Sequence, residues 1–452
     1  MQAVFKLLIL LRKFRLTSAE EKINLQIFSQ KLLGKELVCA LGCTEPIALA
    51  YGAALAGRTL GEPVEHMIVR CSGNIIKNVK SVVVPNSGGL KGVEVAAVLG
   101  LLGGDADREL EVLQSVTPEV VERAQALIAQ GFCEVELVEG VPNLFIVVEV
   151  SGAGHTASVT LRDRHTNVVD VTRDGETIQR ETHDEEDDAY GQEVYRRLSM
   201  ANICAFAREV DLACVKPLLE RQIDCNTAVS EEGLRGHWGS EIGRTILAMH
   251  PADVTTRMRA RAAAGSDARM GGCSLPVVIN SGSGNQGMTV SLPVIEYAAS
   301  VHATHEQLLR ALCISNLTAL HLKRYIGSLS AFCGVVCAAA GAGAAVTYLA
   351  GGTDAQVGST VVNTIANVGG IMCDGAKASC AAKISSAVDA AMLGHTMAML
   401  GEDFCAGDGL VGEDVESSIA SMGYVGRVGM ASTDVEILNI MIGKTRPSCM
   451  CC

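Results

Sequence analysis

The sequence predicts an α+β fold, with a mixed N-terminal half that contains an antiparallel sheet and a mainly helical, Gly/Ala-rich C-terminal half. Two patterns predict this arrangement. Apolar and polar residues alternate with period two between residues 134 and 172, which is typical of half-buried strands. From about residue 190 onward, apolar residues recur at helical spacing between glycines. With 452 residues, of which 48% are hydrophobic and 19% charged, the chain can bury a large core.

The N-terminal elements follow from local patterns in chain order. Residues 21–60 have apolar side chains at helical spacing, with an interruption at 41–46, and Pro46 suits the first turn of the second helix. Beyond them we expect strands at 67–71 and 79–84, a turn at 85–89, a Gly/Ala-rich helix to about 104, a charged helix around 108–130, and an antiparallel meander of strands at 134–138, 143–151, 155–162 and 167–172.

The acidic run at residues 183–188 is typical of a solvated loop and predicts a domain boundary. We therefore expect four parts along the chain. They are an N-terminal extension (1–20), a mixed α/β domain (21–190), a helical catalytic domain (191–446) and a Cys-rich tail (447–452).

Composition and charge argue against two classes of partner. The net charge of −13 disfavours binding to nucleic acid or to an anionic membrane surface, and an aromatic content of 4% leaves few stacking platforms. Residues 331–351 carry no charged side chain, which is long enough for a membrane span. Their Ala/Gly-rich composition instead favours a buried helix in a globular core. We expect no nucleic-acid partner and no membrane segment.

Seventeen cysteines indicate a reducing compartment. A secreted disulfide scaffold would be short and would follow a signal peptide, whereas this chain is long and its cysteine count is odd. The first 13 residues contain an apolar run of five residues after Lys6, and no small-residue cleavage site follows it. We therefore expect a cytoplasmic protein whose thiols are core residues, metal ligands or nucleophiles.

The richest local motif is the glycine-rich segment at residues 280–288, which satisfies G-x-G-x-x-G after an expected strand. A dinucleotide site is disfavoured for two reasons. Pro293 falls inside the would-be helix, and Glu306 lies in a helical first turn capped by Thr304 with Gln307. The remaining interpretations are a tight glycine turn with capping residues, or a cradle of backbone N–H groups for a carboxylate or phosphate. The candidate binding residues are Ser281, Gly282, Ser283, Gly284 and Asn285, with Arg269 nearby in sequence.

Four cysteines in the C-terminal half could face one another. Cys333 and Cys337 are four residues apart, and Cys373 and Cys380 are seven apart, which would place each pair on one helix face. Thiolates are the usual ligands of iron–sulfur clusters. For any single one of these residues, a small apolar cysteine in a helical core is the more common situation. Spacing alone therefore supports a metal site only weakly.

Cys43 precedes the expected helix at 47–56, so the positive end of that helix would lower the pKa of its thiol and make it a base or nucleophile. A buried cysteine in a helix–helix turn is an equal alternative. His155 and His165 lie at strand ends, where a hydrogen-bonded structural role is the more common one. Lys377 and Lys383 flank Cys380, and neither lies in a setting that requires pyridoxal phosphate.

Four long blocks of the sequence resemble the L-cysteine desulfidase family, which includes the UPF0597 proteins and is related to the alpha part of iron–sulfur L-serine dehydratases. The blocks are residues 40–50, 266–272, 280–287 and 372–376, and they occur in the family's order. The likeness runs from about residue 22 to about residue 443. The first 20 residues and the Cys-rich tail lie outside it.

The resemblance implies a pyridoxal-independent β-elimination that converts L-cysteine to pyruvate, ammonia and hydrogen sulfide on a [4Fe–4S] cluster. It implies that Cys333, Cys373 and Cys380 are the cluster ligands, and that Cys43 is the remaining family cysteine, either the general base or a fourth ligand. Cys337 matches no family ligand and is assigned to the core. Arg269 and the backbone of residues 281–287 would hold the substrate carboxylate.

Two other functions remain open at this stage. One is a dehydratase of L-serine or another β-substituted amino acid on the same scaffold, because nothing in the residues decides the leaving group. The other is a non-enzymatic iron–sulfur or thiol redox sensor. The sequence predicts a small amino-acid substrate and leaves a homo-oligomer open.

Overall fold

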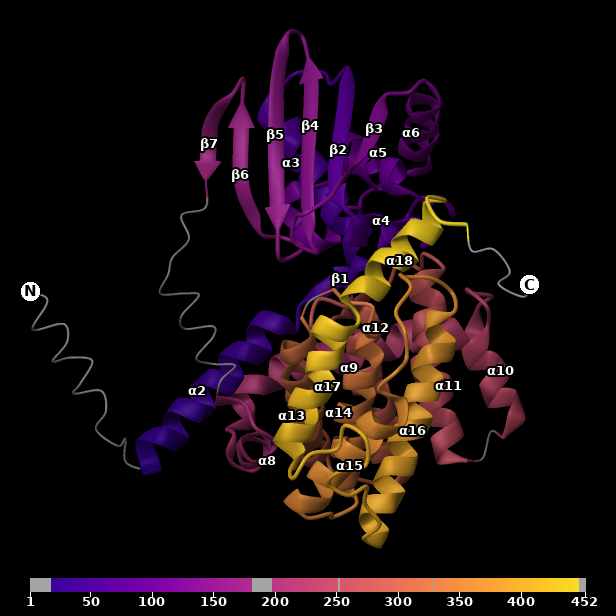
Figure 1. Ribbon diagram of the computed structural model, residues 1–452. Helices are drawn as coiled ribbons and strands as arrows, with labels where there is room; N and C mark the ends of the chain where they lie inside the picture. Colours follow the sequence, from indigo (N-terminus) through magenta and orange to yellow (C-terminus); the bar gives the residue numbers. More distant parts are fainter. Residues whose placement is uncertain (1–17, 181–196, 251–252, 328, 447–452) are drawn as a thin grey trace, which may run out of the picture.

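The computed structural model describes residues 18–180, 197–250, 253–327 and 329–446, and describes side chains from residue 26 onward. A six-stranded sheet with its helices occupies one end of the molecule, and a bundle of helices forms the other (Figure 1). The α+β class predicted from the sequence is confirmed, with the mixed sheet in the N-terminal half and the helices in the C-terminal half. The predicted extension, the acidic run at 183–188 and the Cys-rich tail lie largely or wholly outside the described residues, and the predicted domain boundaries stay predictions.

The N-terminal half alternates helices and strands. Its helices are α2 (Ser18–Glu36), α3 (Thr44–Leu60), α4 (Gly73–Val79), α5 (Val93–Gly103), the short η1 (Ala106–Glu111) and α6 (Pro118–Ala129). Its strands are β1 (Cys39–Leu41), β2 (His66–Ser72), β3 (Cys133–Val138), β4 (Phe145–Gly152), β5 (His155–Arg162), β6 (Val168–Arg173) and β7 (Glu176–Arg180). Helix α3 packs on strands β4 and β5 and on helix α5, so the apolar face of the sheet is covered.

The large sheet has the order β3-β2-β4-β5-β6-β7. Strands β4 to β7 form an antiparallel meander, as the alternating pattern predicts, and β7 is an additional strand. The prediction that 134–138 opens this meander is wrong. Strand β3 pairs with β2 instead, and in parallel, because α5 and α6 carry the chain back across the sheet between them. A periodic pattern defines a strand but not its neighbour.

The predicted strand at 79–84 is also wrong. Helix α4 ends at Val79, and the following residues form turns, with a single bridge between Val83 and Lys91. Buried Val79, Val82 and Val84 produced the alternating pattern, but they pack as turn residues. Helix α4 matters for the site because Lys77 and Asn78 on it are buried polar residues.

The C-terminal half contains helices α8 (Met200–Glu209), α9 (Leu212–Arg235), α10 (Ile242–Met249), α11 (Val254–Met270), α12 (Gly284–Ser300), α13 (His305–Ile326), α14 (Gly334–Leu349), α15 (Asp354–Val368), α16 (Cys380–Leu400), α17 (Val415–Tyr424), the π-helical η2 (Val425–Gly429) and α18 (Ala431–Met441), with the short strand β8 (Pro276–Val278). Helix α12 continues through Pro293, so this proline does not by itself argue against a helix after the glycine-rich segment. The capping box of Thr304 with Gln307 at the start of α13 is confirmed.

Helix α14 is the buried Gly/Ala-rich helix that the sequence predicts between residues 331 and 351. It packs against α12, α13, α15 and α16. Its small residues allow this close approach: a side chain at Gly341 would come within 2.4 Å of the backbone oxygen of Ser315. Among the helices of the described residues, none is both long enough and apolar enough to cross a membrane.

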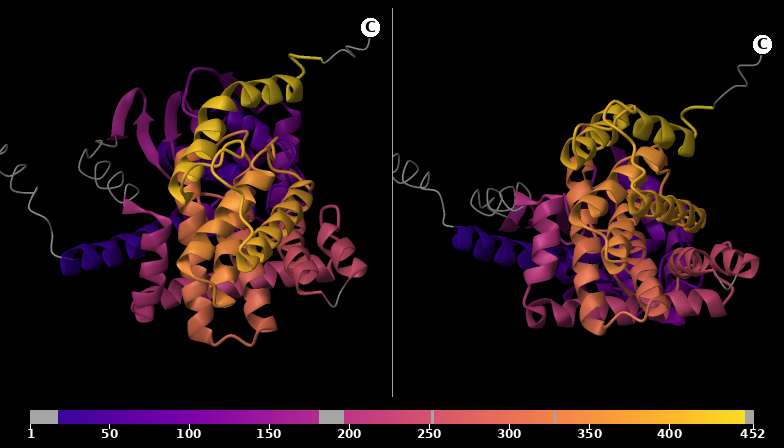
Figure 2. Two further views of the ribbon diagram at one scale, coloured as in Figure 1. Left: turned by 60° about the horizontal axis from the view of Figure 1, so that its bottom comes forward. Right: turned by 90° about the horizontal axis from the view of Figure 1, so that it is seen from below.

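Two of the connections between the halves lie beside the site. Strand β1 of the N-terminal half pairs with β8 of the helical half, with Leu41 opposite Pro276 and Cys39 opposite Val278. Helix α18, drawn in yellow, continues from α17 and η2 beyond the bundle and reaches α4 beside the sheet (Figures 1 and 2). The segments at residues 42–46 and 280–287 lie side by side, joined by a hydrogen bond from Thr44 Oγ1 to the Gly282 carbonyl.

Candidate functional site

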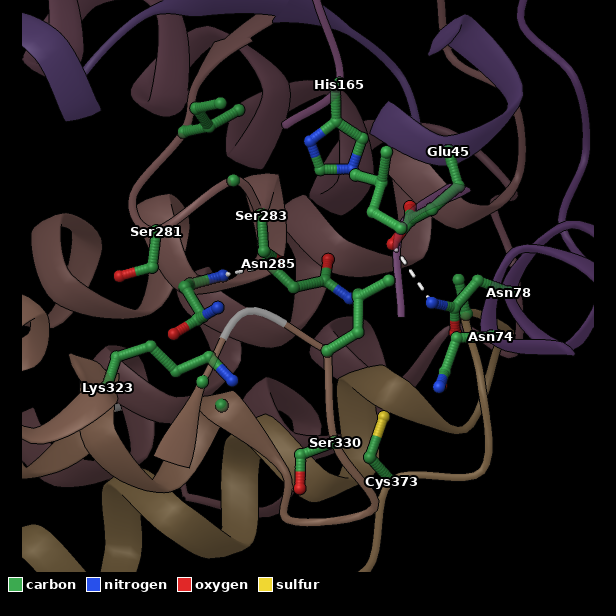
Figure 3. A pocket seen from close by; sticks show the side chains of 18 of the residues that line it. Glu45, Asn74, Asn78, His165, Ser281, Ser283, Asn285, Lys323, Ser330 and Cys373 are labelled. Carbon is green, nitrogen blue, oxygen red and sulfur yellow. Dashed lines mark hydrogen bonds between the residues drawn. The ribbon is translucent and has the colours of Figure 1, made fainter. Parts of the chain in front are cut away.

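A cavity of about 770 Å³ lies between the two halves. Its lining includes nine of the ten predicted site residues: Cys43, Arg269, Ser281, Gly282, Ser283, Asn285, Cys333, Cys373 and Cys380. Gly284 is the exception, because it lies behind the lining, where a side chain would come within 2.3 Å of Arg269 Nε. The structure thus gathers segments that are more than 300 residues apart in sequence (Figure 3).

The turn that presents Cys43 is fixed by glycine and arginine. Gly42 adopts a φ of +60°, and a side chain there would come within 2.2 Å of Pro85. Only glycine adopts this backbone conformation without strain. The Gly42 carbonyl accepts a hydrogen bond of 2.8 Å from Arg269 Nε. Cys43 follows as the N-cap residue of α3, and its side chain is buried.

Cys43 and Glu45 form a hydrogen-bonded pair at the start of α3. The Cys43 thiol donates to Glu45 Oε2 at 3.1 Å, and Asn78 Nδ2 of α4 donates to Glu45 Oε1 at 3.0 Å. Thr44 Oγ1 donates to the Gly282 carbonyl at 2.9 Å, which ties this turn to the glycine-rich segment. We call Cys43, Glu45 and Asn78 the Glu45 wall of the cavity.

The prediction that the helix end lowers the pKa of Cys43 is wrong. Burial raises the pKa of the Cys43 thiol well above its usual value, and the Glu45 carboxylate raises it further. Burial also opposes ionisation of Glu45, but His165, the bond from Cys43 and Arg269 together hold the pKa of Glu45 below its usual value. Burial and a carboxylate at contact distance outweigh the partial charge of a helix end. Cys43 is therefore a thiol whose proton points to an ionised carboxylate.

The glycine-rich segment forms a tight turn before α12. Ser281 and Gly282 have φ of +51° and +73°, and Asn280 and Ser283 exchange backbone hydrogen bonds across them. The Ser283 side chain caps the helix by accepting from the backbone N–H of Gln286. Gly287 lies so close to β8 that a side chain would come within 2.0 Å of the Val278 oxygen. The glycines here serve a turn and close packing, and the first-turn N–H groups of α12 lie beside the cavity.

Three thiols line the opposite side of the cavity. Cys333 and Cys373 lie on adjacent segments: the N–H of Cys333 donates to Ile371 O at 3.0 Å, and that of Cys373 to Ala331 O at 2.6 Å. The Cys333 thiol donates a hydrogen bond to Cys373. Cys380 begins α16. The expectation that Cys373 and Cys380 share a helix face is wrong, because 373–379 are not helical.

Buried cations surround these thiols. The hydrogen bond from Cys333 lowers the pKa of Cys373 to about 6, and the charge of Lys77 contributes. Lys77 on α4 pairs with Asp434 of α18, and Lys383 pairs with Asp374. Cys337 is buried one turn into α14 within the helical core, in agreement with its assignment there. We call Lys323, Cys333, Cys373 and Cys380 the thiol wall.

The donor set of the thiol wall suits an iron–sulfur cluster in its chemistry. In the described part of the chain, no three His, Cys, Asp or Glu side chains are close enough together to hold a single metal ion. A cluster spreads its thiolate ligands over the corners of a cube, so it needs sulfur atoms around one cavity rather than around one point. Cys333, Cys373 and Cys380 meet that requirement by lining one cavity. Among them the pKa of Cys373 is lowered, whereas the hydrogen bond to Cys373 raises the pKa of Cys333 and burial raises that of Cys380.

Several polar residues of the cavity, three of which follow, were not assigned to the site from the sequence. Lys323 of α13 is buried and lines the cavity, and burial lowers its pKa. His165 follows β5, and its Nε2 is buried without a hydrogen-bond partner, unlike the predicted structural histidine. His155, in contrast, bonds Asp174 at 2.8 Å, as expected. The third is Asn78. Of these residues, only Lys323 carries a signal in the sequence, because it is a lysine within the apolar pattern of α13. His165 and Asn78 reach the cavity through tertiary packing.

This fold and cavity are those of a serine dehydratase alpha-chain scaffold. The model of the family described as "Serine dehydratase alpha chain" matches residues 107–439. The chain belongs to the UPF0597 family. It is 49% identical to a UPF0597 protein of Lachnoclostridium phytofermentans over 91% of this chain and 98% of the relative. It is 47% identical to one of Desulfitobacterium hafniense (91% and 96% covered) and 46% identical to one of Finegoldia magna (92% and 99% covered).

Proposed function

We propose that the protein is a pyridoxal-independent carbon–sulfur lyase that converts L-cysteine to pyruvate, ammonia and hydrogen sulfide. The single observation that supports this most is the convergence of three distant thiols, a buried cysteine–carboxylate pair and a glycine-rich turn on one cavity. Membership of a serine dehydratase alpha-chain family supports an elimination reaction. The many free thiols suit a cytoplasmic location.

In this proposal Cys333, Cys373 and Cys380 hold a [4Fe–4S] cluster. A cluster held by three thiolates leaves one iron open as a Lewis acid, which stabilises negative charge on a departing group. Pyridoxal phosphate has no role here. Lys377 and Lys383, the lysines nearest to the thiols in sequence, are both bonded to Asp374.

The Glu45 wall supplies the proton chemistry. Cys43 is the proposed base for the Cα proton, and it must first lose its own proton. The hydrogen bond from Cys43 Sγ to Glu45 Oε2 provides the path for that transfer. The raised pKa of Cys43 makes this transfer unfavourable in the described state. The α-ammonium group of a bound amino acid adds a positive charge beside the thiol, and a nearby cation lowers a thiol pKa.

Arg269 and the glycine-rich turn position the reacting groups. Arg269 holds the Gly42 carbonyl and thereby fixes the turn that presents Cys43. The turn at 281–283 and the first N–H groups of α12 offer hydrogen-bond donors to a substrate carboxylate. Water then hydrolyses the released aminoacrylate without further protein groups.

The test is anaerobic purification followed by quantification of iron and acid-labile sulfide, and then by assays of pyruvate and sulfide from L-cysteine. Pyruvate from L-serine at a higher kcat/KM than from L-cysteine would replace the proposal with the dehydratase alternative. A cluster-loaded protein that forms pyruvate from neither would leave the redox-sensor alternative.

The role of Cys43 is tested separately. If Cys43 is the base, Cys43→Ala keeps the iron and loses turnover. If Cys43→Ala loses the iron as well, Cys43 is a cluster ligand. Cys273→Ala, in a buried thiol away from the cavity, is the matched control and should keep both.

A further inference from the structure

Lys323 is a buried lysine without a hydrogen bond or ion pair to another described side chain, and the negative charges that act on it are those of the thiols Cys333, Cys337 and Cys373. Its side chain is 6% exposed, it extends into the cavity from α13, and among the described residues none forms a hydrogen bond or ion pair with its Nζ (Figure 3). A buried ammonium group without a partner is costly, so such lysines are rare in folded proteins. Lys323 lies in the last turn of α13, where the helix end favours a cation, but its side chain extends into the cavity and not to solvent.

The other cations near the cavity are matched within the protein. Lys77 pairs with Asp434, and Lys383 and Lys377 both pair with Asp374. Arg269 donates to the Gly42 carbonyl and interacts with the Glu45 charge. Lys323 is therefore the buried cation of the described cavity that has neither a hydrogen bond nor an ion pair among the described residues.

The opposite side of the cavity has the reverse character. Glu45 and His165 lie across the cavity from Lys323 (Figure 3). His165 Nε2 and Asn74 Oδ1 are buried and have no hydrogen-bond partner. The orientation of the Asn74 amide is fixed, because its Nδ2 donates to Asp434 at 2.8 Å and a carboxylate can only accept. This side thus offers a carboxylate and an unused acceptor to a cation.

The cavity therefore has an unpaired cation on one side and the unpaired acceptors His165 Nε2 and Asn74 Oδ1 on the other, while Asn285 Oδ1 and Gln286 Oε1 of the glycine-rich segment are unpaired as well. A zwitterion with its carboxylate toward Lys323 and its ammonium group toward Glu45 and Asn74 complements both sides. We infer that Lys323 binds the α-carboxylate of an amino-acid ligand and that the opposite acceptors bind its α-ammonium group. This inference rests on the proposed function for the reaction of the bound amino acid. The binding of the amino acid does not depend on that function.

The assignment changes the role expected of Arg269. The sequence points to Arg269 as the residue that holds the carboxylate. Its Nε is committed to Gly42, and its side chain lies against Gly284. Arg269 is then a positioning residue for the Cys43 turn, and Lys323 provides the charged contact to the carboxylate.

The test compares ligands that differ only in the carboxylate, bound to the anaerobically purified full chain. Calorimetry should give L-alanine a dissociation constant at least about tenfold below that of ethylamine, the size expected for one charged hydrogen bond. Neither ligand has a leaving group, so the result does not depend on turnover. Lys323→Met should abolish the difference by weakening L-alanine alone. Lys216→Met, a surface lysine on a helix, should leave it unchanged.

A second measurement uses the unaltered protein and covers a failure of Lys323→Met to fold. L-alanine should protect Lys323 from acetylation by acetic anhydride, read by peptide mass spectrometry, and ethylamine should not. Equal protection by both ligands, or equal affinities in the calorimetry, overturns the inference. Loss of iron from folded Lys323→Met with unchanged L-alanine affinity also overturns it, because Lys323 then serves the thiols. A protein that binds L-alanine as described but releases no sulfide from L-cysteine contradicts the proposed function alone.

Discussion

The Glu45 wall and the thiol wall face each other across one cavity, and they are built in opposite ways. On the Glu45 wall each polar group is matched locally: Cys43 and Asn78 donate to Glu45, and Arg269 fixes the turn. On the thiol wall, Cys333 donates a hydrogen bond to Cys373, and Lys323 has no acceptor among the described residues. The first wall is held by its own contacts. The thiol wall presents cations and sulfur donors to the cavity, and their chemistry suits the binding of a further group there.

The largest expected effect falls on the thiol wall. Cys373→Ala should lose both iron and turnover, because it removes a sulfur donor that no nearby residue replaces. Cys337→Ala, in a thiol buried in the core nearby, should keep both and lower stability by only about 1 kcal/mol. The measurement is iron and acid-labile sulfide per chain after anaerobic purification. A fully cluster-loaded Cys373→Ala would overturn the ligand assignment.

On the Glu45 wall, Arg269→Lys should lower kcat by about 100-fold, because a misplaced catalytic group costs about that much. Lysine cannot maintain both the bond to Gly42 and the packing against Gly284. Iron content should stay unchanged, which separates this wall from the other. Arg261→Lys on the same helix, in an ion pair with Glu296, is the control and should retain the wild-type kcat. A wild-type kcat in Arg269→Lys would show that the turn does not need this bond.

The close packing of strand β8 against helix α12 depends on Gly287. Gly287→Ala should lower the free energy of unfolding by about 1–3 kcal/mol, because the added methyl group overlaps the Val278 backbone. Gly34→Ala in helix α2, where the added methyl group would have no neighbouring atom within 4 Å, should instead raise the free energy of unfolding by up to about 1 kcal/mol. Denaturant unfolding measures both. Equal effects of the two substitutions would mean that β8 and α12 do not pack this closely.

The smallest effect concerns the acidity of Cys43. The Glu45 charge raises the pKa of the Cys43 thiol, so Glu45→Gln should lower it and increase the thiolate fraction at a given pH. Alkylation of Cys43 by iodoacetamide at pH 8 should become at least about threefold faster, since one pKa unit is a tenfold change in thiolate. Peptide mass spectrometry follows the reaction, with exposed Cys214 as the internal reference. An unchanged or slower rate would show that Glu45 does not control this thiol.

The sequence by itself determined the α+β class, the buried helix α14, the capping of α13 and the motifs that gather at the cavity. These features depend on local periodicity and on residues adjacent in the chain, so a linear pattern records them. The parallel partner of β3, the passage of α12 through Pro293 and the helix at 73–79 were decided by tertiary packing, which overrides local propensity.

Only the tertiary structure decided how the site residues act on one another. The sequence marked Cys43 as a thiol at a helix end, but burial beside Glu45 reversed the direction of its pKa. It gave no reason to connect Lys323 or His165 with the thiols, because both reach the cavity through packing of α13 and the sheet half against each other. Charge, burial and partner are properties of a three-dimensional neighbourhood, and a pattern along the chain does not contain them.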